Sequence, residues 1–91
     1  MTLRIYTHPA CAGCSPAVKM GWDLTESYSD LNLETVKLES KAGLAKAQTA
    51  GIKTIPTLIF ILGDAELKRI IGLPEAQLLE QTFLELRALK N

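Results

Sequence analysis

The chain has 91 residues, enough for one domain with a single hydrophobic core. Ten lysine and arginine residues balance ten aspartate and glutamate residues, which argues against nucleic acid or an anionic membrane surface as the main partner. The longest run without a charge or a breaker, 57–62, is far shorter than the ~20 residues of a membrane span. With no signal-peptide pattern in MTLRIYT, we expect one cytoplasmic domain over residues 1–91, monomeric by default.

A strand is predicted over residues 2–6, where apolar and polar side chains alternate. It leads directly into the stretch HPACAGCSP, residues 8–16, which contains Cys11 and Cys14, the only cysteines of the chain. Two cysteines cannot build the framework of several disulfides that small secreted domains use, and a reducing compartment disfavours a permanent bridge. The pair is therefore a candidate for function more than for structural cross-linking.

A helix is predicted over residues 15–24, where apolar side chains recur at helical spacing. Trp22 is expected in the core or at its edge. Pro16 allows two interpretations, which stay open: it is the first helical residue behind a Ser15 cap, or it bends a helix that already began beside Cys11. In both, the cysteine motif lies between a strand and a helix.

The middle of the chain predicts a second strand and a short helix. Residues 34–39 alternate with Val36 on one face, and the order strand, helix, strand indicates a right-handed parallel crossover. Ser40 suits the N-cap of a helix that Gly51 closes. The apolar side chains of this helix are Leu44, Ala47 and Ala50.

The last third predicts two strands and a helix. Residues 57–62 are apolar at every position after Thr57, as expected of a central strand buried on both faces, so helices must lie on both sides of the sheet. After a turn at 63–66, residues 67–71 return as an edge strand, and Pro74 opens the last helix. The residues on the predicted apolar face of that helix are Leu78, Leu79, Phe83, Leu86 and Leu89.

Two cysteines separated by two residues at a helix start can act as a reversible dithiol. One helical turn brings the sulfurs within bonding reach, and the free amides and the dipole favour a thiolate. Cys11 is the natural nucleophile: it attacks a substrate disulfide, and Cys14 then attacks Cys11 and releases the reduced substrate. This step needs no cofactor beyond the Cys11–Cys14 disulfide itself. His8, when protonated, is a candidate for stabilising the thiolate or passing a proton.

A metal-binding interpretation starts from the same motif, because C-x-x-C is also half of many zinc sites. A closed zinc site needs four ligands, and the chain offers Cys11, Cys14 and His8, so a carboxylate or a second subunit would have to complete it. Cu(I) needs only two sulfurs, but small copper-carrying domains with this motif usually end in a strand, not in a helix. We expect no metal, and a non-catalytic thiol domain that binds Cu(I) or zinc, or senses redox state, remains the alternative.

Residues 51–60, GIKTIPTLIF, closely resemble the segment of thioredoxins that carries their cis-proline and central strand. The likeness continues through the hairpin and the last helix, so that with CAGC it covers most of the chain. By its length and its start at the strand before the motif, the chain resembles a small, glutaredoxin-sized member of the thioredoxin/glutaredoxin-like family. The resemblance implies the thioredoxin fold, an α/β fold with a four-stranded mixed sheet, helices on both faces and the order β-α-β-α-β-β-α.

The resemblance also implies roles for residues far from the cysteines. It implies a cis bond between Ile55 and Pro56 that faces the disulfide, and a substrate-binding segment of Thr54, Ile55 and Pro56 in which Ile55 offers backbone groups to an extended substrate. The implied activity is that of a thiol-disulfide oxidoreductase, a protein-disulfide reductase of the cytoplasm that serves electron transport and redox homeostasis. Its implied partners are protein disulfide substrates and a reductase or small-thiol reductant.

Three features depart from the family pattern. Ala12-Gly13 is neither the Gly-Pro of thioredoxins nor the Pro-Tyr of glutaredoxins, which leaves the redox potential open. Ile5 stands where thioredoxins carry a buried acid that serves proton transfer at the second cysteine. Residues 72–75 replace the Gly-Gly-x-x-Asp-like turn of glutaredoxins, which disfavours glutathione binding. A glutathione-dependent glutaredoxin is therefore the alternative among enzymes.

Overall fold

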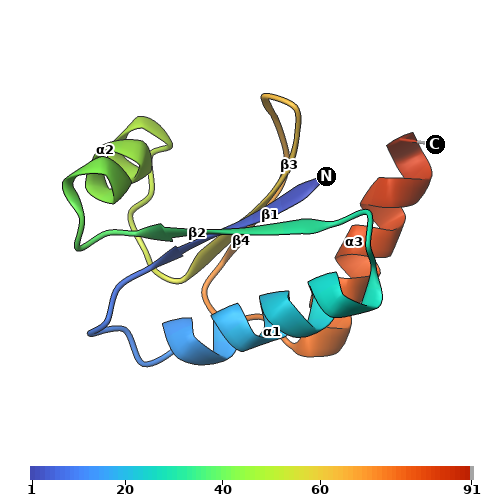
Figure 1. Ribbon diagram of the computed structural model, residues 1–91, viewed down its shortest axis with the longest axis horizontal. Helices are drawn as coiled ribbons and strands as arrows, with labels where there is room; N and C mark the ends of the chain where they lie inside the picture. Colours follow the sequence, from blue (N-terminus) through green and yellow to red (C-terminus); the bar gives the residue numbers. More distant parts are fainter. Residues whose placement is uncertain (91) are drawn as a thin grey trace.

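The computed structural model describes residues 1–90, which form one four-stranded sheet with helices on both faces (Figure 1). The predicted order β-α-β-α-β-β-α is confirmed. None of the described helices has the length and apolar character of a membrane-spanning segment. The elements are β1 (Thr2–Thr7), α1 (Cys14–Ser27), β2 (Asn32–Lys37), α2 (Lys41–Thr49), β3 (Thr57–Leu62), β4 (Ala65–Ile71) and α3 (Ala76–Lys90).

The sheet is mixed, with the strand order β2-β1-β3-β4. β1 pairs with β2 in parallel and with β3 antiparallel, and β4 returns antiparallel to β3. Because β1 and β2 run in the same direction, their carboxyl ends meet at one edge of the sheet, where Thr7 is paired with Lys37. The cysteine motif follows β1 at this edge.

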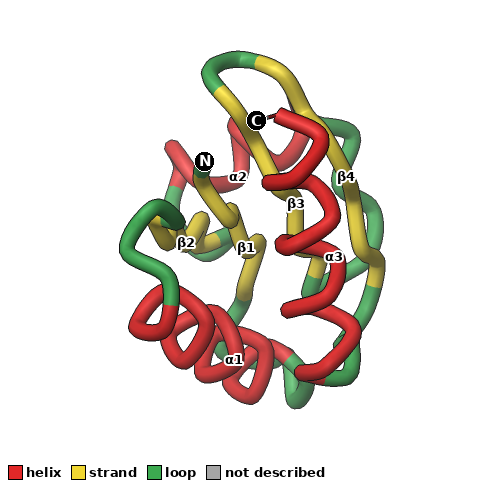
Figure 2. Tube along the Cα trace, turned by 90° about the vertical axis from the view of Figure 1, so that its right-hand side faces the viewer, coloured by secondary structure: helices red, strands yellow, loops and turns green. Residues whose placement is uncertain are grey.

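The larger hydrophobic core lies between the sheet and the pair of helices α1 and α3, which Figure 2 shows on the same side of the strands. Burying one such leucine or phenylalanine contributes about 1.5–3 kcal/mol, so this core holds the start of α1, and with it the cysteines, firmly against the sheet. The fully buried side chains of this core include Leu3, Ile5, Ala17, Leu58, Phe60 and Phe83.

A smaller core lies on the opposite face, under α2. It consists of Tyr6, Val36, Ala47 and Ile59. The predicted cap of α2 is confirmed, because the Ser40 hydroxyl accepts a hydrogen bond of 2.9 Å from the amide of Gly43. Gly51 follows the helix with a φ of 70°, a conformation that favours glycine at the end of a helix.

The start of α1 differs from both predictions made for Pro16. The helix begins at Cys14 behind Gly13, so Pro16 is its third residue. It is neither the first residue behind a Ser15 cap nor a later residue of a helix that began at Cys11. A proline is tolerated here because the first amides of a helix have no partner within it. The consequence is that Cys14 belongs to the helix and Cys11 to the preceding turn.

Several apolar side chains that were predicted to face the core are exposed instead. Successive residues of a helix point about 100° apart, so when Leu79 and Phe83 of α3 face the sheet, Leu78 points aside. In α1, Gly21 lies against the sheet and Trp22 therefore points outward. The exposed side chains of this kind are Trp22, Leu44, Leu78 and Leu89. The second strand also begins and ends two residues earlier than the predicted 34–39.

An ion pair links the first two strands and makes stability depend on pH. Arg4 Nε lies 2.8 Å from Glu34 Oε2, and Lys46 Nζ lies 3.8 Å from Glu34 Oε1. The hydrogen bond from Arg4 holds the pKa of Glu34 below its ordinary value. A lowered carboxyl pKa adds stability above the unfolded-state pKa, and this stability is lost as the pH falls through the folded-state pKa.

We therefore expect Glu34→Gln to reduce the free energy of unfolding at pH 7 by up to about 1 kcal/mol, and this difference from the wild type to shrink as the pH falls below the ordinary glutamate pKa. Urea unfolding between pH 3 and pH 7 measures the difference. Glu26→Gln, the same change at an exposed residue of α1, serves as the control. A Glu34→Gln effect that stays constant across this pH range would contradict the expectation.

Candidate functional site

Cys11 and Cys14 are joined as a disulfide, with their Cα atoms 5.4 Å apart. Cys11 lies in the turn before α1, where its amide donates a hydrogen bond of 3.0 Å to the carbonyl of His8. Cys14 is the first residue of α1, and its amide donates to the carbonyl of Cys11 at 3.2 Å. The turn and the helix start thus hold the two sulfurs within bonding distance, as predicted from their spacing.

The two cysteines differ in their exposure. Cys14 is only 3% exposed, packed under the first turn of α1, whereas Cys11 is half-buried and reaches the surface. An approaching sulfur atom can therefore meet Cys11 but not Cys14. This asymmetry fits the assignment of Cys11 as the attacking sulfur and Cys14 as the resolving one.

The start of α1 favours a thiolate at Cys11. The positive end of the α1 dipole points at the motif, and a negative charge close to a helix start is stabilised. The first turn of α1 contains no acidic side chain that would oppose this effect. A thiolate is the reactive form in disulfide exchange, so the position of Cys11 suits a nucleophile.

Pro56, which lies about 42 positions after Cys14, packs against the cysteine motif. A Cβ atom placed on Gly13 would lie 3.4 Å from Pro56 Cδ and 3.8 Å from Leu73 Cβ. The Ile55–Pro56 peptide bond is cis. The carbonyl of Pro56 accepts a hydrogen bond of 2.7 Å from the amide of Gly72, which ties this loop to the end of β4. The structure therefore brings the two sequence motifs into contact.

The other two residues predicted for substrate binding lie beside Pro56. Ile55 is half-buried and packs against the smaller core. Thr54 is exposed, and its carbonyl accepts a hydrogen bond from the hydroxyl of Thr57.

The ring of His8 is held by the backbone of its own loop. Its Nδ1 accepts a hydrogen bond of 3.0 Å from the amide of Ala10. This bond occupies the Nδ1 lone pair of His8. Its role as a cation beside the thiolate would require this bond to break. Ile5, at the position where thioredoxins carry an acid, is fully buried in the larger core.

A cleft of about 350 Å³ opens beside the disulfide. Both cysteines line it, together with Thr7, the last residue of β1, and His8, and with Lys37, the last residue of β2, and Glu39. The sequence reasoning missed these last two residues. The signal was present, because the carboxyl ends of parallel neighbouring strands lie at one edge of the sheet.

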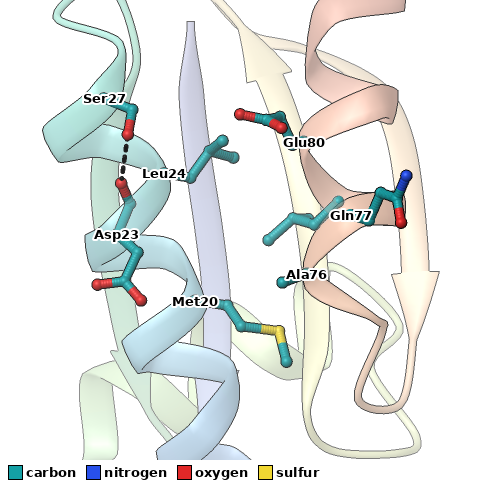
Figure 3. Close-up of a pocket in the computed structure, with 8 residues that line it drawn as sticks. Met20, Asp23, Leu24, Ser27, Ala76, Gln77 and Glu80 are labelled. Carbon is teal, nitrogen blue, oxygen red and sulfur yellow. Dashed lines mark hydrogen bonds between the residues drawn. The ribbon is translucent and has the colours of Figure 1, made fainter.

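A second hollow, of about 230 Å³, lies between α1 and α3 (Figure 3). Met20 and Leu24 of α1 face Ala76 and neighbouring residues of α3 across it, and the hydroxyl of Ser27 donates to the carbonyl of Asp23 at its border. Its lining contains no cysteine, histidine or lysine. Its lining does include the carboxylates of Asp23 and Glu80, but the redox-active cysteines line only the cleft described above.

The chain resembles known proteins in its three-dimensional structure. No family model and no curated protein sequence matches the chain. Thioredoxin 1 from Thermosipho africanus superposes with a TM-score of 0.86 over 100% of this chain and 99% of that chain, at 15% identity. Thioredoxin-2 of a malaria parasite gives 0.82 over 92% and 81%, at 19% identity. The chain has the thioredoxin fold.

A third solved structure shares this fold. Thioredoxin from Trypanosoma brucei brucei superposes with a TM-score of 0.82 over 96% of this chain and 74% of that chain, at 15% identity. The predicted fold class, and the predicted resemblance to thioredoxins, are therefore confirmed at the level of the fold. Within this thioredoxin fold, the Cys11–Cys14 pair forms a disulfide between β1 and α1.

Proposed function

We propose that this chain is a thiol-disulfide oxidoreductase that reduces or exchanges disulfides of other proteins. The observation that carries the proposal is the asymmetric pair at the start of α1, with an accessible Cys11 and a buried Cys14, on a thioredoxin fold. The Cys11 thiolate attacks a substrate disulfide, forms a mixed disulfide and releases one substrate thiolate. Cys14 then attacks Cys11, breaks the mixed disulfide and releases the second thiolate. Two electrons pass from the protein to the substrate.

The surface next to Gly13 supports a protein as the substrate. Leu73 is 47% exposed beside Pro56, and Ile71, at the end of β4, is 67% exposed. An apolar surface next to a reactive sulfur suits an extended peptide segment, which would pair with the backbone at Ile55. After each turnover a reductase or a small-thiol reductant has to restore the dithiol. We place this cycle in the cytoplasm, whose reducing poise keeps such a pair available.

A redox titration tests the proposal. The protein, first checked for bound metal, is equilibrated in graded mixtures of reduced and oxidised dithiothreitol, and its free thiols are alkylated and counted by mass. We expect one two-electron transition, with Cys11 alkylated before Cys14 when the reduced protein is treated at neutral pH. The midpoint then tells whether the pair acts as a reductant or as an oxidant.

Two results would overturn the proposal. Thiols that stay free over the whole range would leave no redox cycle, and a bound metal that protects both cysteines would favour a Cu(I) or zinc carrier. Among residues 1–90, no three histidine, cysteine, aspartate or glutamate side chains are grouped closely enough to hold a metal ion. A metal on this chain would therefore have to be coordinated by the two sulfurs alone or with ligands from a second subunit.

A further inference from the structure

The disulfide has two unlike surroundings. Gly13, Pro56 and Leu73 form an apolar side, and none of them lines the cleft of about 350 Å³ that opens at both cysteines. The cleft instead carries one cation, Lys37, and one carboxylate, Glu39. Small-molecule sites begin at roughly 300 Å³, so this volume suits a small ligand.

The two charges of the cleft are available to a ligand. Within residues 1–90, neither Lys37 nor Glu39 takes part in an ion pair, whereas Glu34 and Glu66 are both paired with arginine. Lys37 and Glu39 are two residues apart at the end of β2, which places their Cα atoms within about 7 Å of each other. Their long side chains can therefore meet a carboxylate and an ammonium that belong to one small molecule.

We infer that the cleft binds the amino-acid end of a small disulfide of the cystine type, which makes such disulfides a second substrate class of the redox pair. An amino-acid disulfide carries an ammonium and a carboxylate on a carbon two bonds from each sulfur. Lys37 binds the carboxylate and Glu39 binds the ammonium, so that the sulfur lies at Cys11. This inference rests on the proposed disulfide-exchange chemistry and adds a substrate class to it.

The reaction balances without a further reagent. The Cys11 thiolate attacks one sulfur of cystine, the cystine S–S bond breaks, and one cysteine thiolate leaves. Cys14 then attacks Cys11, forms the intramolecular disulfide and displaces the second cysteine. The protein dithiol is oxidised by two electrons, cystine is reduced to two cysteines, and the protons of the two protein thiols end on the two products.

A panel of four disulfides tests the inference at low salt. The reduced full-length protein is mixed with cystine, with cystamine, which carries only ammonium groups, with dithiodipropionate, which carries only carboxylates, and with neutral hydroxyethyl disulfide. Protein oxidation is followed by quenching and mass measurement. For each variant, the rate with a charged disulfide is divided by the rate with the neutral one, which removes effects on the cysteines themselves.

Each ion pair between a cleft side chain and the substrate is exposed to solvent, so its loss should change the rate ratio only modestly. Lys37→Gln should lower the ratio for dithiodipropionate and cystine about two- to fivefold, and Glu39→Gln should lower it by a similar factor for cystamine and cystine. Lys68→Gln on β4 and Glu85→Gln on α3 make the same changes in charge at exposed residues outside the cleft, and their ratios should stay at the wild-type value.

The outcomes separate the two proposals. If the ratios of the cleft variants match those of the wild type, or if the control variants shift equally, the cleft does not select by charge and the inference is wrong. In that case a wild-type protein that still oxidises with hydroxyethyl disulfide leaves the proposed function standing. A wild-type protein that reacts with none of the four disulfides overturns the proposed function itself.

Discussion

Under the proposed mechanism, replacement of Cys14 by serine is expected to stop the reaction with a disulfide after a single adduct. Cys11 can still attack, but no second sulfur lies beside it to break the mixed disulfide. Well-oriented internal groups reach effective concentrations of ~10⁵ M, so an external thiol at millimolar concentration should release the substrate slower by several orders of magnitude, with an upper limit of about 10⁸-fold. Intact mass after mixing with a peptide disulfide should show one peptide per protein.

Cys11→Ser is the matched control for this experiment. It removes the same disulfide and one sulfur, but the remaining Cys14 is only 3% exposed. We therefore expect little or no adduct with the same peptide disulfide over the same time. Equal adduct formation by the two serine variants would show that the difference in burial does not decide which sulfur attacks, and the assigned roles would then be wrong.

Gly43→Ala is expected to cause a large loss of stability, because Gly43 lies directly against the backbone of β2. A Cβ atom at this position would overlap the carbonyl carbon and oxygen of Lys37. Backbone atoms cannot move aside as a side chain can, and overpacking costs about 1–3 kcal/mol. The gain in helix propensity, about 1 kcal/mol at most, does not offset a loss at the upper end of this range.

Thermal unfolding measures this effect. In a domain of this size each kcal/mol shifts the melting temperature by about 4–8 °C, so Gly43→Ala should melt roughly 8 °C or more below the wild type. Gly21→Ala is the matched control: its Cβ would lie 2.9 Å from the side-chain ends of Ile5 and Leu33, which can adjust. A Gly43→Ala variant that melts at or above Gly21→Ala would refute the backbone clash.

Local signals in the sequence account for much of the fold. The alternation of residues 2–6, the Ser40 cap and the apolar run of β3 each act within a few residues, and each is found as predicted. The position of both cysteines between a strand and a helix follows from the same local rules. Periodicity within one helix does not decide which part of a wide apolar stripe faces the sheet, and for this reason Leu78 and Leu89 were misplaced.

The candidate site depends more on contacts between distant parts of the chain. No local pattern places Pro56 against Gly13; the expectation came from the resemblance to thioredoxins. Glu39 was missed because the second strand was predicted two residues too late, which put it inside a strand and not in the turn beside the cysteines. Lys37 was missed because a strand pattern alone does not show which neighbouring strand lies beside it. The parallel pairing of β1 and β2 is the observation that brings them to the site.

The two faces of the sheet bury hydrophobic cores of different size, and the smaller core lies under α2. This difference bears on which element unfolds first. α2 contributes only small buried residues, Gly43 and Ala47. A hydrogen bond of 2.8 Å from Arg69 of β4 to the carbonyl of Ala50 connects the end of α2 to the sheet. Elements with little buried apolar surface detach at lower free energy than the rest of a protein. We therefore expect opening of the native state to begin at α2, on the face of the sheet opposite the larger core that holds α1.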